Sequence, residues 1–158
     1  MRVSVNGVSN DDAMILIHAT EAYAKMLMPR MVAHIAVCID VKDRFEFNGE
    51  CSWVESGTRF PRVFVITLKN MRLREVLRTL AHEMVHVKQY ARGELRDGHC
   101  GTTQWKDDYF PVKGGSHGKG YWFSPWEVEA YGMEVGMFEL YGDEIMEKGG
   151  RFENKKLT

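Results

Sequence analysis

Cysteine is scarce in this sequence. Of 158 residues only Cys38, Cys51 and Cys100 are cysteines, and no two of them form a C-x-x-C pair. An odd, sparse count argues against a disulfide framework and fits reduced thiols in a cytoplasm. We therefore predict a cytoplasmic protein with three free thiols, each more typical of a small core residue than of a metal ligand or nucleophile.

Long apolar runs and an excess of one charge are also lacking. No apolar run approaches the length of a membrane span, and the first residues have no apolar segment typical of a secretory signal. The net charge is −1 and no basic stripe occurs, so we expect neither direct nucleic-acid binding nor membrane binding. A length of 158 residues with 44% hydrophobic residues fits one globular domain, residues 1–158.

The strongest pattern in the chain lies in residues 73–93. Its apolar residues recur at helical spacing: Leu73, Leu77, Leu80, Met84, Val87 and Ala91. His82 and His86, one helical turn apart, fall on the opposite face with Glu83 beside them. Two such imidazoles can bind one Zn²⁺, and the adjacent carboxylate can take a proton from a metal-bound water. This HExxH pattern predicts a metal site; a surface helix with two histidines is the alternative.

The elements before this helix predict the fold class. A capped helical pattern occupies residues 10–28, and strand-like patterns follow in residues 33–41, 45–55 and 63–68. Asn70 is the expected N-cap of the central helix. Because this order shows no alternating β-α-β units, we predict an α+β fold with a small, mainly antiparallel sheet packed on that helix. A strand beside the cleft can bind an extended peptide by adding it as another strand.

The chain after the central helix predicts a long loop, a second helix and a tail. Gly93 ends the central helix, and residues 94–120 are rich in glycine, with a short edge strand within 102–110. Ser124, followed by proline, begins a second helix. Glycine and charge dominate residues 142–158, which we predict to be a flexible tail.

A catalytic zinc site usually has three protein ligands and one open position. The residues themselves leave four candidates for the third ligand: Glu127, Glu129, His99 and His117. Glu127 stands at the third position of the second helix, where it would have a fixed location, but a glutamate there can also simply cap the helix.

Residues 82–86, HEMVH, followed by a helix that carries EVEAY at 127–131, resemble the gluzincin metallopeptidases. In that family the third ligand is the glutamate of an E-x-x-A-D motif, which implies Glu127 here. Tyr131 stands where the family usually has an aspartate that orients a ligand histidine. More closely, the sequence resembles a group of small phage and bacterial metallopeptidases over about residues 73–141. The resemblance implies a zincin-like fold.

The implied function is that of a small zinc-dependent metallopeptidase. His82, His86 and Glu127 would hold Zn²⁺, and Glu83 would act as general base toward a zinc-activated water that attacks a peptide bond. The substrate would be a protein or peptide. Candidate donors to the oxyanion are Tyr90, Tyr121, Tyr131 and His117.

Two other functions fit parts of the pattern. A non-hydrolytic, metal-bound interaction module has no need of Glu83. A DNA-associated protease similar to the SprT group would take His99, in Asp97-Gly98-His99, as third ligand, but such a protein would be expected to carry a basic stripe.

Overall fold

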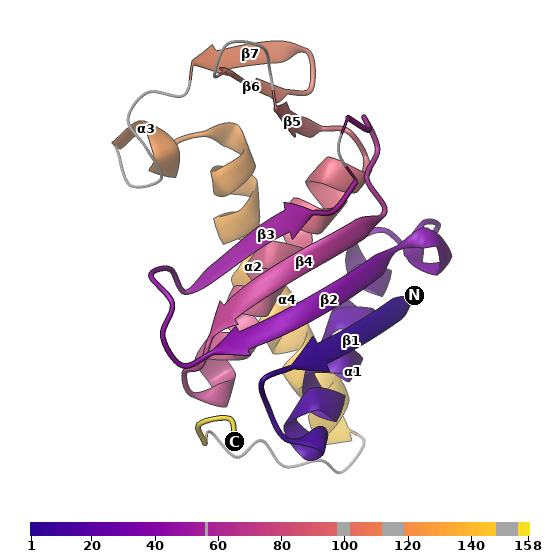
Figure 1. Ribbon diagram of the computed structural model, residues 1–158, viewed down its shortest axis with the longest axis vertical. Helices are drawn as coiled ribbons and strands as arrows, with labels where there is room; N and C mark the ends of the chain where they lie inside the picture. The colour runs from indigo at the N-terminus through magenta and orange to yellow at the C-terminus, as the bar shows by residue number, and fades with distance from the viewer. Residues whose placement is uncertain (56, 98–101, 112–118, 148–154) are drawn as a thin grey trace.

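The computed structural model describes residues 1–55, 57–97, 102–111, 119–147 and 155–158, which form two sheets and four α-helices (Figure 1). The larger sheet has the strand order β1-β2-β4-β3. Its strands are β1 (Arg2–Asn6), β2 (Ala36–Lys42), β4 (Val63–Lys69) and β3 (Gly49–Trp53). The predicted α+β class is confirmed. The prediction of a mainly antiparallel sheet is wrong here, because β1, β2 and β4 are parallel and only β3 is antiparallel.

The parallel pairing of β1 with β2 comes from a strand that the sequence patterns did not reveal; the parallel pairing of β2 with β4 is separate, since β3 lies on the far side of β4. β1 precedes helix α1 (Asn10–Leu27), and β2 follows it, so the three elements form a β-α-β unit. Val3 of β1 lies opposite Val37 of β2 in a parallel ladder. A helical crossover of this kind returns the chain to the same end of the sheet, which makes adjacent strands parallel.

The helices cover one face of the larger sheet. In β2 and β4 every second residue is buried, including Val37, Ile39, Phe64 and Ile66, and these side chains belong to the same core as the apolar faces of the helices. Figure 1 shows α1, α2 and α4 behind the sheet. The alternate residues of these strands are only partly buried, so the opposite face of the sheet is open.

Helix α2 (Leu73–Ala91) is the predicted central helix, and its whole predicted apolar stripe is buried. The predicted N-cap was Asn70, but the N-cap of this helix is Arg72. The Asn70 side chain instead donates to Asp43 Oδ1 at 3.0 Å and to the Leu157 carbonyl at 3.3 Å. Gly93, with φ of +67°, ends the helix as predicted, because a left-handed residue lets the chain turn back.

Helix α4 (Pro125–Glu147) packs antiparallel to α2. Three ion pairs join the two helices with opposite sequence direction: Arg74–Glu139 at 3.3 Å, Arg78–Glu134 at 2.7 Å and Lys88–Glu129 at 2.8 Å. Apolar residues recur at helical spacing in α4; Ala130 and Met137 are buried and Trp126 is partly buried, whereas Met133 and Leu140 are exposed.

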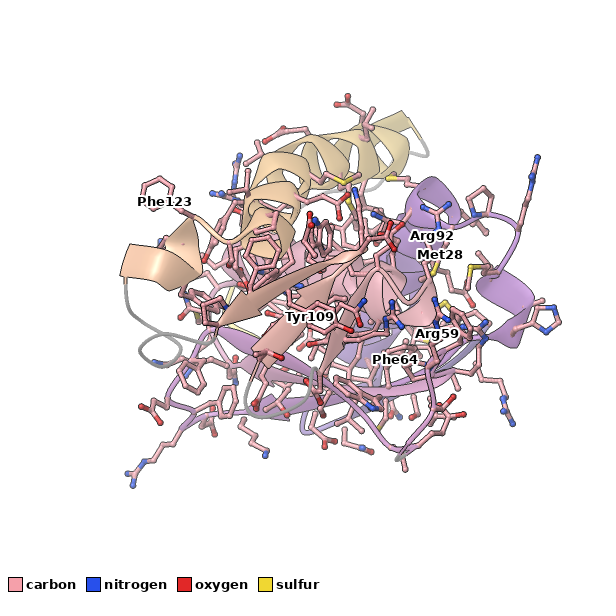
Figure 2. All side chains as sticks on the ribbon, turned by 90° about the horizontal axis from the view of Figure 1, so that it is seen from above. Met28, Arg59, Phe64, Arg92, Tyr109 and Phe123 are labelled. Carbon is pink, nitrogen blue, oxygen red and sulfur yellow. The ribbon has the colours of Figure 1, made fainter. Side chains whose placement is uncertain are left out.

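The predicted long loop contains a second sheet. β5 (Leu95–Asp97), β6 (Thr102–Trp105) and β7 (Asp108–Pro111) form an antiparallel sheet beyond one end of the larger one (Figure 1). The short helices are η1 (Val32–His34) and α3 (Lys119–Trp122). Figure 2 shows Phe123, which joins α3 to α4, projecting away from the body of the protein.

The described cysteines and helices bear on the predictions made from sparse cysteine and from the lack of long apolar runs. Cys38 and Cys51 are free thiols, and Cys100 lies outside the described residues. Among the helices that the structure describes, none combines the length and the apolar character needed to cross a membrane.

The predicted flexible tail is ordered where the structure describes it. α4 continues to Glu147, and residues 155–158 return to the N-terminal ends of α1 and α2. Leu157 is only 3% exposed and joins the main core. The Thr158 amide donates to buried Asp12 at 2.8 Å. A single apolar residue in a polar segment forms no periodic pattern, so the burial of Leu157 could not be predicted from the sequence.

We expect Leu157→Ala to lower the free energy of unfolding by about 2 kcal/mol, because it leaves a cavity in the core. Leu140→Ala is the matched control: Leu140 is 60% exposed on α4, so its loss should change stability by less than about 0.5 kcal/mol. Urea unfolding measures both. Equal midpoints for the two variants would show that residues 155–158 do not dock in solution.

Candidate metal centre

His82, His86 and Glu127 converge in the structure. Their ligand atoms all lie within 4.8 Å of one another, and all three residues are buried. The two imidazole Nε2 atoms are 3.2 Å apart. Glu127 Oε2 lies 3.3 Å from His82 Nε2, and Oε1 lies 3.4 Å from His86 Nε2. The helical spacing of the histidines and the docking of α4 on α2 thus bring two nitrogens and one carboxylate to a common point.

Gln89 fixes the orientation of the His86 ring. Its Nε2 donates to the Trp126 carbonyl at 2.9 Å and to Glu129 at 2.8 Å, so its Oε1 must face His86. His86 Nδ1 lies 2.8 Å from that oxygen and therefore carries the proton. The lone pair of neutral His86 is then on Nε2, which points to the centre of the site.

Glu134 holds the other imidazole. Its carboxylate accepts a hydrogen bond from His82 Nδ1 at 3.1 Å and pairs with Arg78 at 2.7 Å. This is the contact that the resemblance assigns to an aspartate at position 131. Here Tyr131 instead places its ring against His82, with ring centroids 4.5 Å apart. Glu134 thus supplies the orienting carboxylate from one turn further along α4.

The carboxylates of Glu127 and Glu134 stabilise positive charge on His82. Burial opposes the charged form of His82, but Glu127 and Glu134 outweigh it and raise its pKa to about 9. Burial lowers the pKa of His86, so that ring stays neutral. Burial also opposes ionisation of Glu127, yet its pKa is lowered because both histidines stabilise the carboxylate. In the absence of metal, a proton on His82 supplies the cationic charge that these groups favour.

The residues fit a metal ion with nitrogen and oxygen ligands. Glu127 is 2% exposed, and its Oε2 has no well-aligned hydrogen bond among the described residues. An unsatisfied buried carboxylate oxygen is costly, and a cation at the common point would satisfy it. Two imidazoles and one carboxylate form a donor set that suits Zn²⁺ with an open fourth position. The centre therefore fits a zinc-type ion.

Glu83 lies beside this centre and does not join the ligand group. Its side chain lines the cleft although the residue is only 5% exposed. Burial raises the pKa of Glu83 to about 8, against the opposing effect of the His82 charge. A carboxyl group with a pKa near neutrality can both accept and return a proton.

Gly49 makes room for Glu83. It lies in β3, which runs directly over this part of α2. A Cβ atom at this position would lie 2.6 Å from Glu83 Oε1 and 2.5 Å from Thr79 Cγ2. The close approach of the strand to the helix therefore requires glycine.

A cleft of about 690 Å³ opens over the centre. β3, an edge strand of the larger sheet, borders one side, and α3 and α4 border the other. Among the predicted oxyanion donors, Tyr121 lines the cleft, where burial and the nearby Glu127 carboxylate raise its pKa, and the ring of Tyr90 packs on Trp53 with centroids 4.3 Å apart. The site is thus accessible from outside and has a phenol beside it.

Of the other proposed third ligands, Glu129 is not at the centre. Glu129 pairs with Lys88 and Gln89 instead. His99 and His117 lie outside the described residues. Glu127 faces the imidazoles, and no capping contact of its side chain is recorded among the described residues.

The sequence patterns did not identify two residues that orient the imidazoles of the centre. Gln89 lies three residues after His86, a spacing that puts both on one face of α2 and was available as a signal. Glu134 lies seven residues after Glu127, also on one helical face, but several other acidic residues of this helix offered equal alternatives.

Comparison of the chain with protein-family models, with curated proteins and with solved structures finds no significant match. The assignment of a function therefore depends on the geometry of the site.

We expect Glu134→Ala to weaken zinc binding about 10–100-fold, because His82 loses the group that fixes its ring and tautomer. Glu134→Gln should recover part of this loss, since an amide oxygen can still accept the Nδ1 proton. Glu139→Ala is the matched control: this glutamate also joins α4 to an arginine of α2, but through an exposed pair away from the histidines. Chelator competition that gives equal zinc affinity for Glu134→Ala and Glu139→Ala would contradict the role of Glu134.

Gly49→Ala should lower the free energy of unfolding by about 1–3 kcal/mol, because the new methyl group overlaps Glu83 and Thr79. Gly132 on α4 has no atom within 4 Å of the position of an added Cβ. Gly132→Ala should therefore leave stability unchanged or raise it by up to about 1 kcal/mol. Denaturant unfolding compares the two variants. A Gly49→Ala protein as stable as the natural one would show that β3 does not lie this close to α2.

Proposed function

We propose that this protein is a small zinc-dependent metallopeptidase of gluzincin type. The observation that carries the proposal is the convergence of His82, His86 and Glu127 beside the separate, buried carboxyl group of Glu83 in an open cleft. A metallopeptidase needs this division between ligands and general base. The resemblance of residues 82–86 and 127–131 to gluzincins gives the same four residues the same roles.

The protein residues divide the chemistry as follows. Zn²⁺ bound by His82, His86 and Glu127 would supply Lewis acidity, which polarises a carbonyl group and lowers the pKa of a bound water toward neutrality. Glu83 accepts the proton of the attacking water and returns it to the leaving amine. Glu134 and Gln89 keep both imidazoles in the tautomer that ligation needs. Tyr121, whose side chain lines the cleft near Glu127, is the proposed donor to the oxyanion.

The substrate is proposed to be an extended peptide. β3 borders the cleft and pairs with β4 on one side only among the described strands. A peptide in extended form can add to the other side of such a strand through main-chain hydrogen bonds. This arrangement would hold a peptide bond over Glu83 and the metal ligands without requiring a particular sequence.

The site favours hydrolysis over a purely structural use of the metal. Structural zinc sites are closed by four protein ligands, whereas three ligands are grouped in the described part of this chain and the cleft opens beside them. Burying Glu83 also has an unfavourable free energy of desolvation that a structural site has no reason to include. We therefore rank the non-hydrolytic module second.

Loss of a ligand and loss of the base should have different effects. His82→Ala, His86→Ala and Glu127→Gln should each weaken zinc binding by orders of magnitude, because two ligands hold the ion poorly. Glu83→Gln should keep zinc but reduce hydrolysis of a labelled, unfolded protein about 10²–10⁴-fold, since the proton acceptor is lost. Zinc affinity is measured by chelator competition and hydrolysis by peptide release.

Glu129→Gln is the control for Glu127→Gln, because it removes a carboxylate two residues away that lies outside the ligand group. It should leave zinc affinity nearly unchanged, because the glutamine oxygen can still accept from Gln89, although the protein should lose stability at Lys88. Native affinity in Glu127→Gln would remove Glu127 from the ligand set. A zinc-loaded protein that cleaves no peptide, with Glu83→Gln indistinguishable from it, would overturn the peptidase proposal and favour the interaction module.

A further inference from the structure

The cleft is lined by more acidic residues than the proposed metal chemistry needs. Six glutamates and one arginine line it: Glu46, Glu50, Glu75, Glu83, Glu127, Glu134 and Arg78. A bound divalent ion together with Arg78 would balance only half of these carboxylates. A ligand in the cleft therefore meets an excess of negative charge even in the metal-bound protein.

Most of these glutamates already have a partner or a role. Glu127 is a candidate ligand, Glu83 the candidate base, and Glu134 binds both His82 and Arg78. Glu75 accepts a hydrogen bond from the Arg72 amide in the capping box at the start of α2. The Arg78 guanidinium pairs with Glu134 at 2.7 Å, so part of its positive charge is already offset.

Glu46 and Glu50 remain for a substrate. Both are exposed, and within the described ranges neither has a recorded ion-pair partner. Glu50 belongs to β3, next to Gly49, and Glu46 lies in the segment that leads into this strand. If a peptide pairs with β3, its side chains become cross-strand neighbours of Glu50, where an opposite charge is favourable and a like charge is not.

The opposite wall of the cleft is aromatic. Trp122 of α3 and Tyr131 of α4 line it with ring centroids 5.2 Å apart, and both are well exposed. Exposed aromatic faces attract ammonium and guanidinium groups, and they also pack against the aliphatic part of a lysine or arginine side chain. The two walls, although different in chemistry, therefore favour the same kind of side chain.

We propose that this cleft selects extended peptide segments with lysine or arginine beside the bound peptide bond, through Glu46 and Glu50 on one wall and the Trp122–Tyr131 pair on the other. The inference rests on the proposed peptidase function, since it names the substrate class of the same site. It does not depend on the rate of hydrolysis, because recognition by charge is a property of binding.

Binding is measured with three fluorescent peptides of equal length that differ only in carrying lysine, glutamine or glutamate at the same three positions. The zinc-loaded Glu83→Gln protein binds without cleaving. The lysine peptide should bind at least about tenfold more tightly than the glutamate peptide at low salt, and the ratio should fall as salt screens the charges. Glu46→Gln and Glu50→Gln, made in the same background, should each reduce the ratio severalfold. Glu21→Gln, which removes an equal charge from α1 outside the cleft, should not.

The outcomes separate this inference from the peptidase proposal. Equal affinity for the three peptides, no measurable binding of any of them, or a lysine preference that survives both Glu46→Gln and Glu50→Gln would overturn the inference. Hydrolysis by the natural protein is measured separately on the same peptides. Cleavage of all three at equal rates would leave the peptidase proposal standing and count against charge selection.

Discussion

The docking of α4 along α2 is the contact on which the candidate site depends. His82 and His86 come from one helix, but Glu127 reaches them only because α4 lies antiparallel beside it. Lys88 shows how firmly this contact is specified: its ammonium group is nearly buried and is held by Glu94 and Glu129, both at 2.8 Å. A buried charge that loses one partner is strongly destabilising, so a shift of α4 along α2 would have a large free-energy cost. The candidate metal ligands share this constraint.

The same contact concentrates negative charge around one point. Glu83, Glu127 and Glu134 all lie near His82, and each affects its charge state. Carboxylates this close repel one another, and burial strengthens the repulsion. A proton on His82 offsets part of it, and a divalent ion would offset more while displacing that proton. Metal binding is therefore expected to add to the stability of the α2–α4 contact as well as to complete the site.

Local sequence patterns predicted the two helices that carry the candidate site. The parts of the fold that were not predicted depend on contacts between residues far apart in the chain. The stripe from Leu73 to Ala91 is visible within one helix, and the beginning of α4 near Ser124 has local signals of its own. β1 is too short for such a signal, and its parallel partner lies some thirty residues away. Its omission hid one parallel pair, and the other, β2 with β4, arises because β3 lies on the far side of β4 from β2. Leu157 likewise joins the core from a polar segment, which only the folded chain reveals.

The orientation of the two histidines explains why the supporting carboxylate stands at 134. His86 Nδ1 is held by Gln89, which lies toward the C-terminal end of α2. His82 Nδ1 is held from the other direction, on the side of Arg78, which lies toward the N-terminal end. Because α4 runs antiparallel to α2, its residues after Glu127 lie progressively closer to the N-terminal end of α2. Tyr131 fills the space over the His82 ring, and Glu134, on the same helical face but one turn further, reaches the nitrogen. The chemical role expected at position 131 is thus fulfilled by another residue, which position-by-position matching of the motif does not detect.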